Sequence, residues 1–67
     1  METIEVGGTI RLGQFLKYAN LAESGAQARL MLADGMVQVD GEVETRRGRQ
    51  LHGGEVVEIQ GARVRVG

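Results

Sequence analysis

The 67-residue chain lacks cysteine, proline and tryptophan, and only 3% of its residues are aromatic. Without cysteine, neither a disulfide bond nor a thiolate metal site can add stability to so small a chain. The low aromatic content predicts a core of aliphatic side chains, and the absence of proline excludes a rigid linker. We therefore expect a single domain, residues 1–67, that buries only about 60% of the surface of the unfolded chain.

Long apolar segments are also missing from the sequence. No apolar run approaches the roughly 18 residues that a membrane-spanning helix needs. The segment Met1–Glu5 has neither the basic region nor the apolar run of a signal peptide. These features predict a cytoplasmic protein with no membrane partner.

Residues that support catalysis or metal binding are few. His52 is the single histidine, and the carboxylates are scattered without the spacing of metal ligands. The pairs Gly7-Gly8 and Gly53-Gly54 lack the Gly-Lys-Ser/Thr ending of a phosphate-binding loop and are typical of turns. A chain of this size also offers little concave surface for an acid–base pair. We expect no enzymatic activity, no cofactor and no small-molecule substrate.

The stretch from Ser24 to Gly35 predicts a short, capped helix. The Ser24 hydroxyl can accept a hydrogen bond from the first turn, and the side chain of Gln27 is expected to reach back to the N–H of Ser24, as in a capping box. Gly35 stands where a helix needs a residue with positive φ to leave its last turn. The expected buried stripe of this helix comprises Ala28, Met31 and Leu32.

A β-hairpin is predicted directly after Gly35. Val37 and Val39 alternate with polar neighbours at the period of a half-buried strand. The dipeptide Asp40-Gly41 then favours a type I′ turn, which needs positive φ at both central residues. Helix and hairpin are therefore expected to form one unit.

The rest of the chain adds another helix and further strands. The segment Ile4–Val6 reads as a short edge strand, and a helix is predicted from Leu12 onwards. Two later segments, Val56–Ile59 and Val64–Val66, alternate like strands. The apolar stripe of the first helix comprises Leu12, Phe15, Leu16 and Ala19.

The charges are balanced overall but unevenly distributed. The formal net charge is −1 and the sequence pI is about 5.7, which argues against a uniformly basic nucleic-acid-binding protein. However, Arg46, Arg47 and Arg49 lie within four positions, with no acid between Glu44 and Glu55. Local potential decides where a polyanion docks, so this segment is either a solvated loop or a binding site.

Four short motifs, at residues 11–17, 24–29, 35–41 and 51–57, occur together in a specific order. In this order and spacing they resemble the S-four RNA-binding domain, also called the alpha-L motif. The resemblance covers Ile10 to Ile59. It implies an α+β fold in which two N-terminal helices pack on a small, bent antiparallel sheet of four to five strands.

The resemblance also implies a function. S-four domains recognise structured RNA, chiefly ribosomal or transfer RNA, and occur as appended modules and as short stand-alone bacterial proteins that associate with ribosomes. Because this sequence is nearly all module, it resembles the stand-alone branch. We therefore expect a non-catalytic protein that binds structured RNA and has a ribosomal subunit as a further partner. We expect a monomer, although the sequence does not fix the oligomeric state.

Candidate RNA-binding residues follow from the match to the family's basic positions. Many members carry Arg or Lys directly after the capping serine, where this chain has Gly25, and Gly13 stands where Asp is usual. Backbone N–H groups at Gly25, Ala26 and Gln27 could still hold a phosphate at the helix N-terminus. With so few aromatics, stacking of splayed bases is not expected. The candidate residues are Arg11, Lys17, Gly25, Gln27, Arg29, Arg46, Arg47 and Arg49.

Two alternatives of other classes stay open. The outer side of the second helix carries Leu30, Ala26 and Ala33, which could form a contact surface for a protein partner. The glycine at position 67 suggests a ubiquitin-like sulfur carrier, but such carriers end in Gly-Gly, and here Val66 precedes it. Arg63 and Arg65, on the last predicted strand, either extend the basic surface or face solvent.

Overall fold

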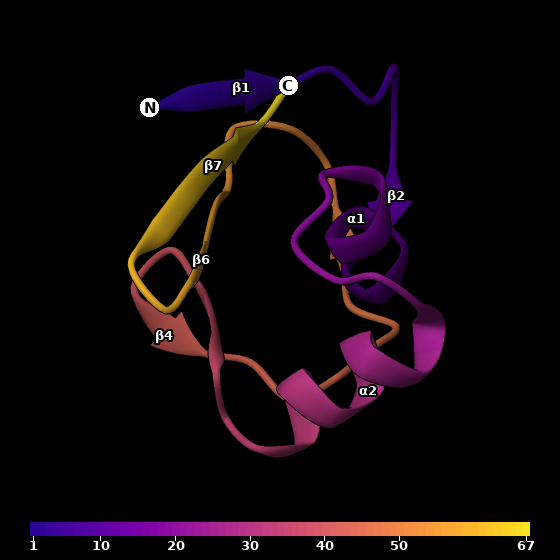
Figure 1. Cartoon of the computed structure of the whole chain (residues 1–67). Helices are drawn as coiled ribbons and strands as arrows, with labels where there is room; N and C mark the ends of the chain where they lie inside the picture. The colour runs from indigo at the N-terminus through magenta and orange to yellow at the C-terminus, as the bar shows by residue number, and fades with distance from the viewer.

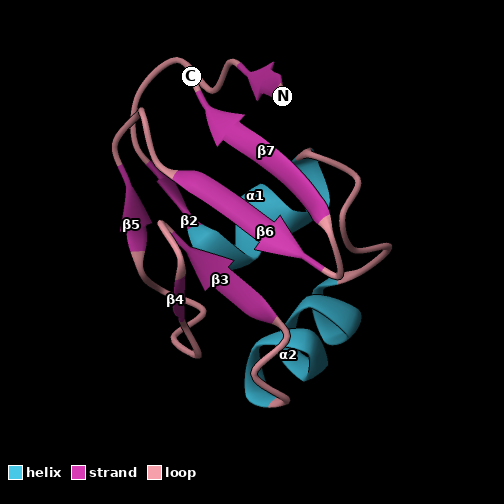
Figure 2. Ribbon diagram, turned by 90° about the vertical axis from the view of Figure 1, so that its left-hand side faces the viewer, coloured by secondary structure: helices cyan, strands magenta, loops and turns pink.

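Two helices cover one face of a five-stranded sheet, and a two-stranded sheet lies beside them (Figure 2). The computed structural model describes residues 1–67. Its elements in chain order are β1 (Glu2–Ile4), β2 (Ile10–Arg11), α1 (Leu12–Tyr18), α2 (Gly25–Ala33), β3 (Val37–Val39), β4 (Glu42–Val43), β5 (Gln50–Leu51), β6 (Val56–Ile59) and β7 (Ala62–Val66). The predicted α+β class is confirmed, and helices are present in both predicted segments, but β1 and β2 precede them, so the helices are not N-terminal.

The larger sheet is mixed, with the strand order β1-β7-β6-β3-β4. All of its neighbouring strands are antiparallel except β1 and β7, which pair in parallel with Glu2 opposite Val64. Figure 1 shows these two strands together beside the N- and C-termini. The prediction of a purely antiparallel sheet is therefore wrong at β1.

A separate antiparallel pair is formed by β2 and β5, with Ile10 opposite Leu51. Two short strands thus precede the helices, where the sequence predicted one, and the predicted bounds Ile4–Val6 are wrong because β1 spans Glu2–Ile4. The second of them, β2, runs directly into α1 and fixes its N-terminus against the segment that follows β4.

The buried faces of the helices match the predicted stripes. In α1, Leu12, Phe15 and Leu16 are fully buried, while Gln14 and Lys17 are exposed. The buried side of α2 consists of Ala28 and Leu32, with Met31 partly buried against them. Opposite them lie the inward valines of β3, β6 and β7. The core cluster comprises Leu12, Phe15, Leu16, Ala22, Ala28, Leu32, Val37, Val39, Leu51, Val57, Ile59, Val64 and Val66.

The predicted turns are confirmed by the backbone angles. Gly35 has φ of 74° at the end of α2, and Asp40 and Gly41 have φ of 53° and 87° in the two-residue turn between β3 and β4. The Asp40 carboxylate also accepts a hydrogen bond of 3.0 Å from the N–H of Val56, which joins this hairpin to β6.

Neither α1 nor α2 has the length and apolar character that crossing a membrane requires.

Candidate functional site

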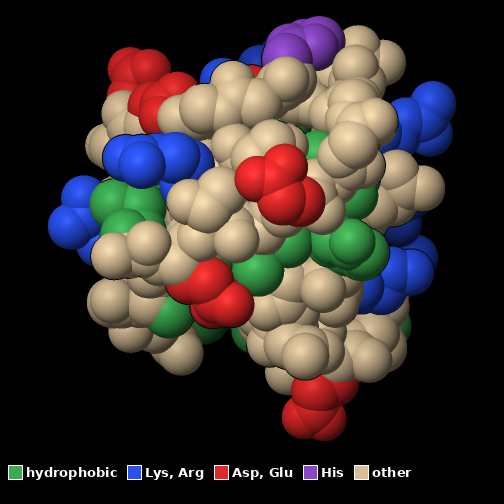
Figure 3. Space-filling model, turned by 90° about the horizontal axis from the view of Figure 1, so that it is seen from above, with side chains coloured by type: hydrophobic (Ala, Val, Ile, Leu, Met, Phe, Trp, Pro, Cys, Tyr) green, Lys and Arg blue, Asp and Glu red, His purple; other side chains and the backbone are tan.

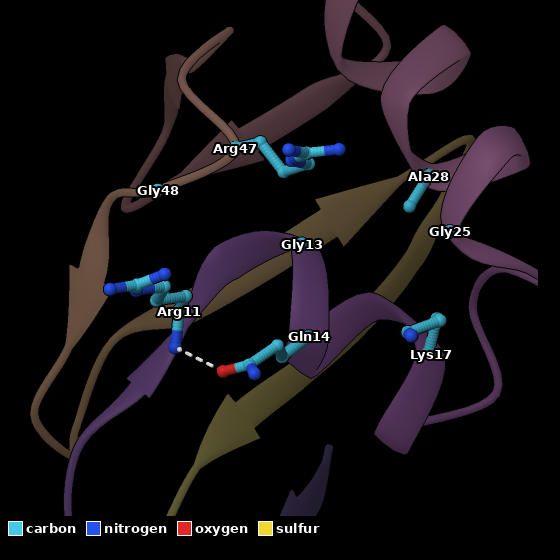
Figure 4. Close-up of a pocket in the computed structure, with 8 residues that line it drawn as sticks. All are labelled: Arg11, Gly13, Gln14, Lys17, Gly25, Ala28, Arg47 and Gly48. Carbon is cyan, nitrogen blue, oxygen red and sulfur yellow. Dashed lines mark hydrogen bonds between the residues drawn. The ribbon is translucent and has the colours of Figure 1, made fainter.

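A groove of about 310 Å³ lies between α1, α2 and the loop that precedes β5 (Figure 4). Three of its lining side chains are cationic, and none is a carboxylate. We call this feature the basic groove. Its lining residues are Arg11, Gly13, Gln14, Lys17, Gly25, Ala28, Arg47 and Gly48.

One wall of the basic groove is the polar side of α1. Burial of the apolar stripe of α1 in the core turns Gln14 and Lys17 outward. Arg11 precedes the helix, and its backbone N–H donates a hydrogen bond of 3.4 Å to Oε1 of Gln14. In Figure 4 the side chains of Arg11 and Lys17 lie on opposite sides of Gln14. The helical spacing of these three residues brings two cations to one surface.

The start of α2 forms the opposite wall. The N–H of Gln27 donates a hydrogen bond of 3.1 Å to Oγ of Ser24, which confirms Ser24 as the helix cap. The side chain of Gln27 accepts from the N–H of Glu23, so the predicted contact with the N–H of Ser24 is wrong by one residue. Because its N–H is already engaged, Gln27 does not offer a phosphate the donor that was expected. Gly25 does line the groove, and a Cβ added there would meet open space.

The arginine-rich loop is organised by Glu44, which is only 7% exposed. Its Oε2 accepts from the backbone N–H groups of Thr45 (3.0 Å) and Arg46 (3.1 Å) and from Nε of Arg46 (3.1 Å). Its Oε1 accepts from Nη2 of Arg46 (3.0 Å) and Nη1 of Arg49 (3.2 Å). Two of the three arginines of the loop, Arg46 and Arg49, are therefore paired with a buried carboxylate.

These contacts shift the ionisation of the pair. The side-chain hydrogen bond from Arg46, together with its backbone N–H and the bond from Arg49, lowers the pKa of Glu44 from 4.5 to about 2 against the opposing effect of burial. The hydrogen bond to Glu44 in turn raises the pKa of Arg46. Both groups are thus charged at neutral pH.

Arg47 is the arginine of the loop that forms no salt bridge. Its carbonyl oxygen accepts a hydrogen bond of 3.0 Å from the N–H of Gly13, and the carbonyl of Arg49 accepts one of 2.7 Å from the N–H of Leu12. The loop is therefore fastened to the first turn of α1. The side chain of Arg47 passes over Gly13 and extends toward α2 (Figure 4).

The structure divides the predicted site residues into two groups. Arg11, Lys17, Gly25 and Arg47 come together in the basic groove. The residues that do not line it are Gln27, Arg29, Arg46 and Arg49. Arg29 is exposed on the surface of α2, and Arg46 is exposed beside the groove.

The sequence reasoning missed Glu44, Gly13 and Gln14. Helical spacing could have found Gln14, since it lies three residues after Arg11 and three before Lys17. The position of Glu44, two residues before the basic run, was a signal for an ion pair. No local signal marked Gly13, because the residue that covers it lies far along the chain.

Charges elsewhere on the surface are mixed. Arg63 and Arg65 alternate with buried Val64 and Val66, so they face away from the helices, and Nε of Arg63 lies 3.8 Å from Oε1 of Glu58. Another face shows acidic side chains among neutral atoms, with Lys and Arg toward its edges (Figure 3). Leu30 on α2 is 64% exposed.

Comparison with protein families gives a match to the S4 domain over residues 3–67. Among its relatives, the chain is 50% identical over 52 residues to "Probable ribosome maturation protein RlbA" of Bacillus subtilis (strain 168), covering 78% of this chain and 73% of the relative. It is 42% identical over 57 residues to "Putative RNA-binding protein YbcJ" of Escherichia coli (strain K12), covering 85% and 81%.

Two solved structures share the fold. The solution structure of YbcJ from E. coli, described as revealing an alpha-L motif involved in RNA binding, superposes with a TM-score of 0.74 at 40% identity over 98% of this chain and 86% of that one. The crystal structure of the 30S ribosomal protein S4e from Thermoplasma acidophilum gives a TM-score of 0.70 at 25% identity. That match covers 87% of this chain and 31% of the larger protein.

Proposed function

Because the chain belongs to the S4 domain family, we propose that it binds structured RNA, ribosomal RNA in particular, by holding phosphates in the basic groove. The observation that carries this proposal is the groove itself: Arg11, Lys17 and Arg47 line it, and no carboxylate does. Arginine offers phosphate a planar pair of donors and lysine a compact positive charge. A surface that combines them suits the backbone of a folded RNA.

The mode of recognition that fits is one based on shape and phosphates. Phe15 is fully buried, and the hydroxyl of Tyr18 donates a hydrogen bond of 3.2 Å to the carbonyl of Glu5. Neither ring is placed in the groove, so the groove has no aromatic platform for an unstacked base. Double-helical or compactly folded RNA presents its phosphates without needing such a platform.

The names of the relatives support a ribosomal target. One is named as a ribosome maturation protein and another as an RNA-binding protein, and each covers most of this chain. We infer a role in binding ribosomal RNA, at a ribosomal subunit or its precursor in the cytoplasm. We propose a role in binding, as the S4 domain family and the RNA-binding names of the relatives suggest.

The sulfur-carrier alternative finds no support in the fold. The N–H of Gly67 donates a hydrogen bond of 2.8 Å to the carbonyl of Ile4, and the carbonyl of Gly67 accepts one from Val6. Gly67 is thus held against the β1 segment instead of extending as a free glycine tail.

The proposal is tested by measuring affinity for a structured ribosomal RNA fragment across a salt series. Neutralising Lys17→Gln and Arg47→Gln together should weaken binding about 10-fold or more and reduce the slope of log affinity against log salt by roughly 1.4 to 1.8, because two phosphate contacts are lost. The matched control, Arg63→Gln with Arg65→Gln, removes the same charge from the sheet face that points away from the helices.

Two results would overturn the proposal. One is an absence of RNA binding by the wild-type protein at low salt. The other is an equal loss of affinity in the groove variant and the sheet-face variant, since that would show only the effect of net charge. Binding to a protein partner that survives nuclease and high salt would instead favour the exposed surface around Leu30.

A further inference from the structure

Glu44 is an acidic residue placed beside a groove that is otherwise cationic. Its carboxylate accepts five hydrogen bonds, two at Oε1 and three at Oε2. The donors are Thr45, Arg46 and Arg49 of the same loop. With 7% exposure it has little contact with solvent. A carboxylate in this state is charged but directed inward, so its main effect is on the shape of the loop.

The same loop is fastened on its other side by α1. The N–H groups of Leu12 and Gly13, which begin the helix, donate to the carbonyls of Arg49 and Arg47 at 2.7 Å and 3.0 Å. The backbone between Glu44 and Arg49 is therefore held by a buried carboxylate at one side and by a helix start at the other. The one long side chain that neither fastening engages is that of Arg47, which lines the basic groove.

Arg46 and Arg49 are held in different ways by the carboxylate. Arg46 uses one edge of its guanidinium for both oxygens of Glu44, while its side chain remains 76% exposed. Arg49 is turned inward, with a side chain that is 31% exposed. The carboxylate thus binds Arg46 and Arg49, and Arg47 is left to line the basic groove.

We propose that Glu44 is a positioning residue for RNA binding, which fixes the loop so that Arg47 is presented to the basic groove. This inference rests on the proposed function. The two possible effects of replacing Glu44 on RNA affinity have opposite signs. Removal of an acid beside a polyanion site should raise affinity through charge alone, whereas loss of a positioning residue should lower it. Binding is favoured when the contact side chain is already ordered, because less conformational freedom is then lost.

The main variant is Glu44→Gln, which keeps the shape of the side chain. Its amide nitrogen cannot accept the hydrogen bonds now made at one carboxylate oxygen, so at least two of the five contacts are lost. Glu44→Asp keeps the charge but shortens the side chain, so it separates the effect of geometry from that of charge. The matched control is Glu58→Gln, which frees an arginine on the opposite face, where Glu58 pairs with Arg63.

The test is a double-mutant cycle on affinity for a structured ribosomal RNA fragment, with wild type, E44Q, R47Q and the double variant. E44Q is expected to weaken binding about 5- to 10-fold in the wild-type background and less than about 2-fold when Arg47 is already replaced, and E44D is expected to weaken binding similarly in the wild-type background. E58Q should leave affinity unchanged or slightly raised. Equal effects of E44Q in both backgrounds, or tighter binding by E44Q, would overturn the inference.

A second measurement separates this inference from the proposed function. Order parameters of the backbone amides and of the Arg47 side chain, measured by NMR in the free protein, should fall in E44Q and E44D and stay unchanged in E58Q. If the wild type binds no RNA, the proposed function fails, while this measurement still shows whether Glu44 orders the loop. An equally ordered Arg47 in the variants would overturn the positioning role, and a folded E44D keeps the test available if E44Q unfolds.

Discussion

The side chain of Arg47 occupies the space in which any side chain at Gly13 would have to lie. A Cβ built on Gly13 would overlap Cγ of Arg47 and would lie 3.1 Å from its Cδ. The two residues are also joined through their backbones, since the N–H of Gly13 donates to the carbonyl of Arg47. The absence of a side chain at position 13 thus allows a cation from the distant loop to cross α1 and reach the basic groove.

Replacing Gly13 by alanine should displace Arg47 from the groove. The backbone at Gly13 is helical, where alanine is favoured over glycine by about 0.5–1 kcal/mol, but the overlap of its Cβ with Cγ of Arg47 opposes this gain. The free energy of unfolding is therefore expected to be unchanged or lower, while affinity for structured RNA falls about 5- to 10-fold, close to the loss in Arg47→Gln. Affinity titrations of G13A, R47Q and the double variant check this. Additive losses in the double variant would show that the two positions act separately.

Adding a cation at Gly25 should strengthen RNA binding. Gly25 lines the groove, nothing lies within 4 Å of a Cβ added there, and its φ is not positive. Gly25→Arg is expected to tighten binding several-fold and to steepen the salt slope by about 0.7 to 0.9, the contribution of one further phosphate contact. The comparison is Ala26→Arg, which adds the same charge one residue away, outside the groove lining. A similar gain in both variants would argue against a localised site.

Substitutions at Ser24 should separate stability from binding. Ser24→Ala removes the acceptor for the N–H of Gln27 and should lower the free energy of unfolding by about 1 kcal/mol, or the Tm by about 4–8 °C, with little change in RNA affinity at low temperature. Ser24→Asp keeps a good cap and should keep the stability. Its negative charge next to Gly25 should lower RNA affinity about 2- to 5-fold. Thermal unfolding and RNA titration of both variants give the answer, and equal affinity of S24D and wild type would contradict the placement of RNA at this wall.

Acid should remove the stabilisation that Glu44 provides. Its pKa is lowered from 4.5 to about 2 in the folded protein, so its contribution is fully present above about pH 4.5 and is lost as the pH falls toward 2. The difference in unfolding free energy between wild type and E44Q should therefore be constant from neutral pH down to about 4.5 and shrink below it. Urea unfolding at a series of pH values measures this difference. A gap that persists unchanged at pH 2 would show that Glu44 titrates normally or acts without its charge.

Glu55 also stabilises the folded protein less in acid, but it should not affect the difference in unfolding free energy between wild type and E44Q. Partial burial alone would raise the pKa of Glu55, and hydrogen bonds from the backbone N–H groups of His52 and Gly53 more than offset it, so the pKa is lowered. Because Glu55 is present in both proteins, its acid-dependent loss is common to both curves. Only the part due to Glu44 remains in the difference.

Local features of the fold could be predicted from the sequence because nearby residues decide them. The positive φ at Gly35 and at Asp40-Gly41 follows from the conformations that these residues adopt most easily. The stripes of α1 and α2 follow from helical spacing alone. The resemblance to the S-four domain rested on such local motifs, and the family match confirms it.

Pairings between distant segments could not be predicted in the same way. Nothing in Glu2–Ile4 indicates a parallel neighbour more than sixty positions along the chain. The arginine run indicated a basic loop, but its composition did not reveal which two guanidinium groups Glu44 binds and which one is left for the groove. Side-chain pairing depends on the three-dimensional path of the loop. That path is fixed by backbone hydrogen bonds from the start of α1, which lies far from the loop in the sequence.

The contrast between the basic groove and the rest of the surface has a consequence for the kinetics of encounter. The chain as a whole carries −1 and the groove carries +3, so the remainder carries −4. An approaching polyanion then meets a mixed surface whose net charge is negative outside the groove and positive at the groove. Such a charge distribution orients the protein before contact and limits unproductive adhesion to other RNA, at the expense of a slower association than a uniformly basic protein would achieve.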